Sequence, residues 1–243
     1  MAEGASPLEQ FAIHRIVTIH IGGFDVSITN SAVAMVVATV LVTAFLTLGM
    51  RRHALVPGRW QSLAEMSYEF VANMVRENSG HDGMRYFPFI FTLFMFILFA
   101  NFLGLIPYSY TVTSQIIVTF ALAAVVFIGV NIVGIVRHGF HFLRLFVPQG
   151  VPAPLLLLLV PIELLSHCIK PFTLSIRLFA NMLAGHTMLA IFGGFAASIG
   201  LLGIFPLGIN VLLVALEVLV AALQAYVFAI LTCLYLSDSI NLH

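Results

Sequence analysis

The chain has 243 residues, of which 61% are hydrophobic and 8% are charged, and its 10 basic and 10 acidic residues leave no net charge. Soluble domains carry roughly 45–50% apolar and about 25% charged residues, so this composition excludes a water-soluble enzyme and a disordered chain. The balanced charge does not indicate a nucleic-acid partner or an acidic substrate. With a mean hydropathy of +1.09, the sequence predicts an all-α integral membrane protein.

The amino-terminal segment, residues 1–30, carries charged residues among short apolar stretches and shows no secretory signal. The first long apolar run covers residues 31–50, and its roughly 20 residues match the ~30 Å thickness of the hydrocarbon core. Residues 57–83 mix charged residues with apolar residues at helical spacing, including Trp60, Met66 and Phe70. This pattern predicts an amphipathic helix on the membrane surface, and a solvated loop helix is the alternative.

Two further apolar runs lie within residues 88–136, joined by the short, uncharged connection 107–113. A basic inner loop, residues 137–153, follows them. Residues 154–243 then hold two very long apolar regions, each longer than a perpendicular span requires, so we expect strongly tilted helices. The sequence therefore predicts about five membrane-entering helices and one surface helix. The two cysteines, Cys168 and Cys233, are expected to pack as small hydrophobic residues.

Positively charged residues are concentrated in two connections, at Arg51, Arg52 and Arg59 and again at Arg137 and Arg144. Basic loops stay on the cytoplasmic side of a membrane, and the uncharged connections should face outward. The sequence therefore predicts an amino terminus outside and a carboxyl terminus in the cytoplasm, or in the matrix for a mitochondrial protein.

The fourth apolar region carries polar residues that are costly within a bilayer and are therefore candidates for function. They recur at separations of four and three residues, which places them on one face of a helix over about 27 Å. The members of this polar stripe are Glu163, His167, Lys170, Arg177 and Asn181, with the apolar Leu174 at the same spacing. Pro171 is expected to kink the stripe. His186 lies about half a turn further round and meets a different environment.

The fifth apolar region carries Glu217 and Gln224, seven residues apart and hence on almost one face. Tyr235 continues that face, and Asp238 lies where the region ends. Titratable groups spaced through a membrane are typical of a proton relay, and histidine suits this role because its unperturbed pKa is about 6.5. A structural ion pair between Arg177 and Glu217 is the alternative, although it leaves the other polar residues unexplained.

Four stretches together resemble subunit a of the F-type ATP synthase. The most specific is SIRLFANMLAGH, from Ser175 to His186. The others are NFLGLIP at residues 101–107, PQGVP at residues 148–152, and the segment from Glu217 through QAYVF at 224–228 to Tyr235. They cover the chain from about residue 88 to its carboxyl terminus. The histidine at 186 with glutamate at 217 is the arrangement typical of mitochondrial and α-proteobacterial members.

This resemblance implies a proton-conducting stator, with no covalent chemistry of its own, in the energy-coupling membrane of a bacterium or mitochondrion. Its partners would be a ring of c subunits, the b or peripheral-stalk subunits, and lipid. Arg177 would face the carboxylates of the ring, and Asn181 lies one turn away. Glu163 would line the inner half-channel. His186, Glu217 and Gln224 would line the outer one. Further candidates for the proton path are Ser166, His167, Tyr235 and Asp238. No cofactor, metal or nucleic acid is expected.

Two rival interpretations remain open from the sequence. A proton-coupled secondary transporter would show paired repeats with broken helices near the midplane, and the sequence shows no internal repeat. A haem-binding respiratory anchor is suggested by the nine histidines. Of these, only His167 and His186 lie within apolar segments, whereas haem requires axial ligands within a packed helix pair. An absorbance spectrum would identify haem directly.

Overall fold

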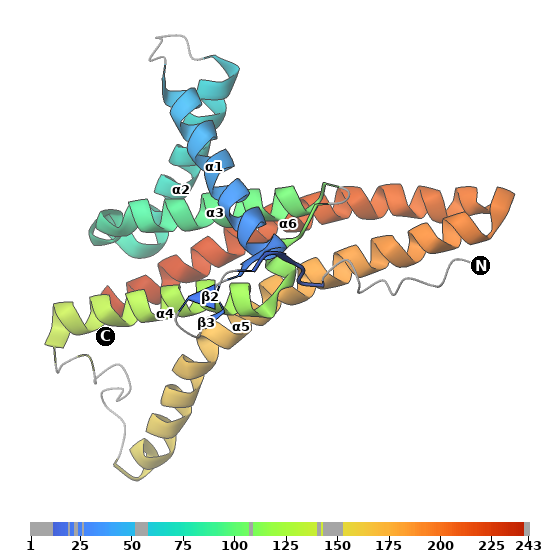
Figure 1. Ribbon diagram of the computed structural model, residues 1–243. Coiled ribbons are helices and arrows are strands. Elements are labelled where there is room, and N and C mark those ends of the chain that lie inside the picture. The colour runs from blue at the N-terminus through green and yellow to red at the C-terminus, as the bar shows by residue number, and fades with distance from the viewer. Residues whose placement is uncertain are drawn as a thin grey trace.

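The computed structural model describes residues 12–18, 20–21, 24–25, 27–51, 58–106, 109–139, 142 and 153–240. Within these ranges, five helical segments are long and apolar enough to cross a membrane, which confirms the predicted all-α membrane class. The main helices, shown in Figure 1, are α1 (Asn30–Met50), α2 (Arg59–Gly83), α3 (Phe87–Gly104), α4 (Ile116–His138), α5 (Ala153–Ser198) and α6 (Ile204–Ile240). The basic loop predicted at 137–153 lies mostly outside the described residues, as does the PQGVP turn.

Short elements precede or join these helices. Before α1, β1 (Arg15–Val17) pairs antiparallel with β4 (Ile28–Thr29), and β2 (His20–Ile21) pairs with β3 (Phe24–Asp25). Thr29 then caps α1, because its hydroxyl accepts a hydrogen bond from the backbone N–H of Ala32 at 3.3 Å. Among the described residues, three 3-10 turns connect later helices: η2 (Met84–Tyr86), η3 (Val112–Ser114) and η5 (Gly200–Gly203).

Helix α2 has two unlike faces. Its buried face consists of small and medium residues, including Val71, Val75 and Ser79, and it packs against α1 and α6. The Ser79 hydroxyl donates to the carbonyl oxygen of Cys233 at 2.8 Å. The larger apolar residues stay uncovered, with Trp60 69% exposed and Met66 63% exposed. The predicted amphipathic helix is therefore present, and its position on the membrane surface stays a prediction.

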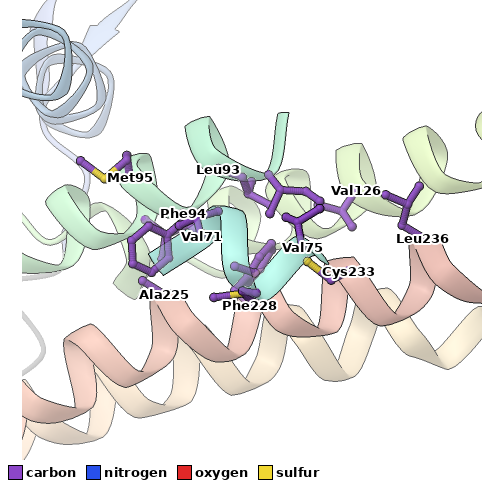
Figure 2. Close-up of a cluster of buried hydrophobic side chains, with 14 of the residues drawn as sticks. Val71, Val75, Leu93, Phe94, Met95, Val126, Ala225, Phe228, Cys233 and Leu236 are labelled. Carbon is purple, nitrogen blue, oxygen red and sulfur yellow. The ribbon is translucent and has the colours of Figure 1, made fainter. Parts of the chain in front are cut away.

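The hydrophobic core lies where α2, α3, α4 and α6 meet, with α5 contributing Leu174 and Leu178. Figure 2 shows Val71 and Val75 of α2, Phe94 of α3 and Phe228 of α6 pointing into this cluster. Because all four of these side chains are less than 10% exposed, the cluster fixes α6 against the rest of the chain. Helix α6 is thereby held as the surface on which α5 packs.

Helix α5 bends where its yellow first part passes into its orange second part (Figure 1), and the helix contains Pro161 and Pro171. Proline removes a backbone donor and clashes with the preceding turn, so the bend agrees with the expected kink. Beyond it, α5 and α6 run side by side past the other helices (Figure 1). This pair exposes large apolar residues such as Phe205 and Leu212, at 77% and 72%.

The two cysteines differ in their surroundings. Cys233 of α6 is fully buried in the core, as expected from the sequence. Cys168 of α5 is exposed, so the expectation that it packs inside the chain is wrong. The physical reason is its position on α5 beside His167, because the histidine takes the face that meets α4.

Candidate functional site

Arg177 lies in the middle of the polar residues that α5 carries. Leu174, Leu178 and Met182 form the buried face of this part of α5, at 2%, 1% and 0% exposure, and Arg177 projects from a different face with Asn181. Both polar side chains are exposed. The Arg177 guanidinium forms no hydrogen bond or ion pair with any residue that the structure describes. A permanent positive charge is therefore presented at the surface of an apolar helix pair.

The backbone at Arg177 is held by α6. The Gln224 side chain is buried, and its Nε2 donates to the carbonyl oxygen of Arg177 at 2.9 Å. One turn earlier on α6, the carbonyl oxygen of Ala221 accepts a hydrogen bond from Nδ2 of Asn101 in α3, at 3.1 Å. The Gln224 hydrogen bond fixes the position of α5 along α6 at Arg177. The Asn101 hydrogen bond fixes the position of α6 along α3 at nearly the same level. Gln224 thus contacts the arginine backbone, and its role in the proton path stays a prediction.

On one side of Arg177, the chain assembles Thr111, His186 and Glu217, which we call the His186 cluster. Nε2 of His186 lies 3.5 Å from Oε1 of Glu217 and 3.0 Å from Oγ1 of Thr111. The Glu217 side chain is 4% exposed, and neither carboxylate oxygen receives a hydrogen bond from a described residue. The titratable group beside the Glu217 carboxylate is the His186 imidazole, and no Arg177–Glu217 ion pair forms among the described residues.

Gly185 makes room for the Glu217 carboxylate. A Cβ atom at position 185 would lie 2.7 Å from Oε1 and 3.0 Å from Cδ of Glu217. Asn181, Gly185 and Glu217 also line a cavity of about 210 Å³ between α5 and α6, otherwise walled by Ala184, Met188, Leu213, Leu216 and Val220. Water occupies about 30 Å³ per molecule in the liquid, so this cavity has room for several. It connects the acid of the His186 cluster with Asn181, one turn from Arg177.

On the other side of Arg177, Lys170, Tyr235 and Asp238 form what we call the Lys170 cluster. Nζ of Lys170 lies 3.3 Å from Oδ2 of Asp238 and 4.8 Å from the centre of the Tyr235 ring. The side chains of the ion pair are 24% and 52% exposed. Glu163 and Ser166 precede this cluster on α5, and both are exposed.

The predicted polar stripe on α5 is divided between two environments. His167 is buried, and its Nε2 lies 3.0 Å from Oδ1 of Asn131 in α4. Glu163, Arg177 and Asn181 are exposed instead. Glu163 and His167 both precede Pro171, so this division follows from which part of α5 is covered by α4, where Asn131 meets His167. Within the part of the chain that the structure describes, no three His, Cys, Asp or Glu side chains are grouped to hold a metal ion.

The two clusters lie toward opposite ends of the helices. Arg137, near the end of α4, pairs with Asp82 near the end of α2, and Nε2 of His138 lies 3.0 Å from the carbonyl oxygen of Ile240, the last residue of α6. These contacts bring three helix ends together at the end nearer the Lys170 cluster. Thr111, by contrast, belongs to the connection between α3 and α4 at the opposite end of both helices.

The fold and this site define an integral membrane protein in which ionisable groups are held along a pair of long helices. Comparison with known proteins shows which family of membrane proteins the chain belongs to. The chain belongs to the ATP synthase A chain family, whose model matches residues 32–237. It is 57% identical over 242 residues to ATP synthase subunit a of Parvibaculum lavamentivorans, covering 97% of this chain and 93% of that protein. It is 51% identical to ATP synthase subunit a of Paramagnetospirillum magneticum, over 98% and 100% of the two chains. It is also 51% identical to that of Pelagibacter ubique, over 98% of each chain.

Proposed function

We propose that this chain is the proton-translocating stator subunit of an F-type ATP synthase. It works beside a ring of c subunits and is held by the b or peripheral-stalk subunits. Two offset half-channels load and unload the ring carboxylates, and Arg177 separates them. The His186 cluster belongs to the outer half-channel, and Glu163 with the Lys170 cluster belongs to the inner one. The family and its named relatives support this proposal.

The observation that carries the proposal is the unpaired guanidinium of Arg177. An arginine exposed on an apolar helix pair is costly in a bilayer unless it meets an anion or water. None of the described acids of this chain pairs with it, so the anion comes from another subunit. The exposed apolar residues around the α5–α6 pair suit a lipid-embedded helical partner. A carboxylate on each c subunit supplies the required charge and can pass Arg177 repeatedly as the ring turns.

The outer half-channel delivers protons to the ring. A proton reaches His186, passes to Glu217, and crosses the cavity beside Asn181 to a ring carboxylate near Arg177. The protonated carboxylate is neutral and can then face lipid, which an ionised one does only at a high cost. Each ring site therefore travels almost a full turn before it releases its proton near Glu163. The membrane potential contributes about 2.3 kcal/mol per charge for every 100 mV.

Arg177 has two functions in this scheme. It stabilises the ring carboxylate while that group is ionised, and its fixed charge prevents protons from passing directly between the half-channels. Arginine suits both functions because it stays charged (pKa above about 12), whereas a buried lysine loses its proton readily.

The proposed orientation places the amino terminus outside and the carboxyl terminus inside. Arg137 lies at the joined ends of α2, α4 and α6, and basic residues favour the cytoplasmic or matrix side. The Lys170 cluster then opens inward, and the uncharged connection that carries Thr111 faces outward. The chain thus lies in the energy-coupling membrane, with the Lys170 cluster toward the inner compartment and the buried His186 cluster toward the outer one.

Replacing Arg177 with alanine tests this function. We expect Arg177→Ala to abolish proton-driven ATP synthesis in inverted membrane vesicles while the synthase still assembles, because the exposed side chain makes no hydrogen bond or ion pair with a described residue. A passive proton leak through the variant would support the barrier function. Substantial ATP synthesis by assembled Arg177→Ala complexes would contradict the proposal.

A further inference from the structure

Thr111 joins the His186 cluster from a distant part of the chain. It precedes η3, is 4% exposed, and packs under the end of α3. A Cβ atom at Gly104 would lie 2.7 Å from Cγ2 and 2.9 Å from Oγ1 of Thr111, so only glycine permits this approach. The Ser114 hydroxyl donates to the carbonyl oxygen of Thr111 at 2.7 Å and fixes the local backbone. The position of the Thr111 hydroxyl is therefore set by α3 and η3, independently of α5.

The Thr111 hydroxyl has two partners with different chemistry. Its Oγ1 lies 3.4 Å from the carbonyl oxygen of Gly104, which only accepts hydrogen bonds, and 3.0 Å from Nε2 of His186. If the hydroxyl donates to Gly104, it accepts the proton of Nε2. The carboxylate of Glu217 approaches the same nitrogen at 3.5 Å and also favours a proton there. Two acceptors, the Thr111 hydroxyl and the Glu217 carboxylate, thus lie next to Nε2. Only the carboxylate is titratable.

We propose that Thr111 is a positioning residue of the outer proton path, whose hydroxyl holds Nε2 of His186 before and after its proton passes to Glu217. This inference rests on the proposed function. In the transfer, the His186 imidazolium loses its Nε2 proton: the N–H bond at Nε2 breaks, an O–H bond forms on the Glu217 carboxylate, and a neutral imidazole with its proton on Nδ1 remains. Before transfer the hydroxyl accepts from Nε2. After transfer it rotates away from Gly104 and donates to the bare nitrogen, so His186 keeps its orientation throughout.

Removing this hydroxyl without changing its size tests the inference in the assembled synthase. We expect Thr111→Val to lower proton-driven ATP synthesis about threefold to tenfold, the scale of one lost hydrogen bond in a buried site. Thr111→Ser keeps the hydroxyl and should stay within about twofold of the unaltered protein. Thr113→Val is the matched control, because Thr113 is fully buried in the same turn and its hydroxyl has no partner among the described residues.

A double substitution separates positioning from packing. In a His186→Leu background, Thr111→Val should cause no further loss, because the hydroxyl acts through the imidazole. The inference is overturned if Thr111→Val behaves like the unaltered protein, if Thr113→Val lowers synthesis equally, or if the Thr111→Val effect multiplies with that of His186→Leu. Arg177→Ala in the same vesicles reports on the proposed function separately. If it retains synthesis, the stator function fails. If it abolishes synthesis while Thr111→Val does not lower it, only the role of Thr111 fails.

Discussion

The two polar clusters along α5 and α6 hold their charges in opposite ways. In the His186 cluster, the side chains of His186 and Glu217 are 13% and 4% exposed, and the carboxylate lacks hydrogen bonds within the described chain. In the Lys170 cluster, the side chain of Asp238 is 52% exposed, and Glu163 beyond it is also exposed. In a buried, closed cluster, proton transfer depends on the exact position of each side chain that carries the proton. In an exposed, open cluster, water molecules can carry the proton instead. We therefore expect the His186 cluster to be far more sensitive to substitution.

The largest effect should come from the proton carriers of the closed cluster. His186→Leu and Glu217→Leu should each lower proton-driven ATP synthesis by about 100-fold, a typical contribution of a positioned proton-transfer group. Because the two groups lie 3.5 Å apart on one path, the double variant should lose much less than the product of the two effects. Rates of ATP synthesis in vesicles with matched amounts of assembled synthase measure this. Effects that simply multiply would show that the two residues serve separate paths.

A smaller effect should come from moving the acid without removing it. Gly185→Ala places a Cβ atom 2.7 Å from Oε1 of Glu217, which is closer than a carbon–oxygen contact allows. The displaced atoms are the flexible end of a side chain, so the synthase should assemble while the carboxylate shifts away from its present position. We expect a roughly tenfold loss of ATP synthesis, since misplacement of a reacting group by about 1 Å costs up to ~100-fold. Gly194→Ala on the same helix is the control, because its Cβ atom would meet no neighbour within 4 Å. Equal rates for the two variants would refute the positional requirement.

The smallest effect should come from the open cluster. Glu163 is exposed, so water can replace its carboxylate as a proton acceptor. We expect Glu163→Gln to slow ATP synthesis by about threefold or less, a loss far smaller than that of Glu217→Leu. Glu217→Gln, measured in parallel, provides a matched change of the same chemistry in the closed cluster. If Glu163→Gln proves as damaging as Glu217→Gln, the contrast between the clusters does not hold.

Much of the fold follows from the sequence because long apolar runs determine where helices lie. The helix predicted at 31–50 is α1, and the two long regions predicted from residue 154 onward are α5 and α6. The apolar residues of α2 were harder to interpret. Its large members, such as Trp60, stay largely exposed, with ring contacts such as that to Phe45. Smaller residues such as Val71 form the buried face, because helices that pack closely favour small side chains.

The site was only partly predictable, for a related reason. His186 and Glu217 stand out because ionisable residues are rare in apolar helices, and the structure brings them together. Thr111 carried no such signal, since a threonine in a short connection is common and its contact spans 75 residues of sequence. Gly185 was likewise hidden, because its importance depends on a side chain of another helix. Periodicity places residues on a face of one helix, but it does not determine which residues of other elements meet that face.

The central claim is that two half-channels open on opposite sides of the membrane. Cysteines introduced as Glu163→Cys and Ser198→Cys test this directly, because both positions are exposed and they lie on opposite sides of Arg177 along α5. The exposed Cys168 is first replaced with serine. With a membrane-impermeant thiol reagent, a cysteine at 163 should react from the inner side only and a cysteine at 198 from the outer side only. Reaction of both cysteines from the same side, or of position 163 from the outer side alone, would contradict the account.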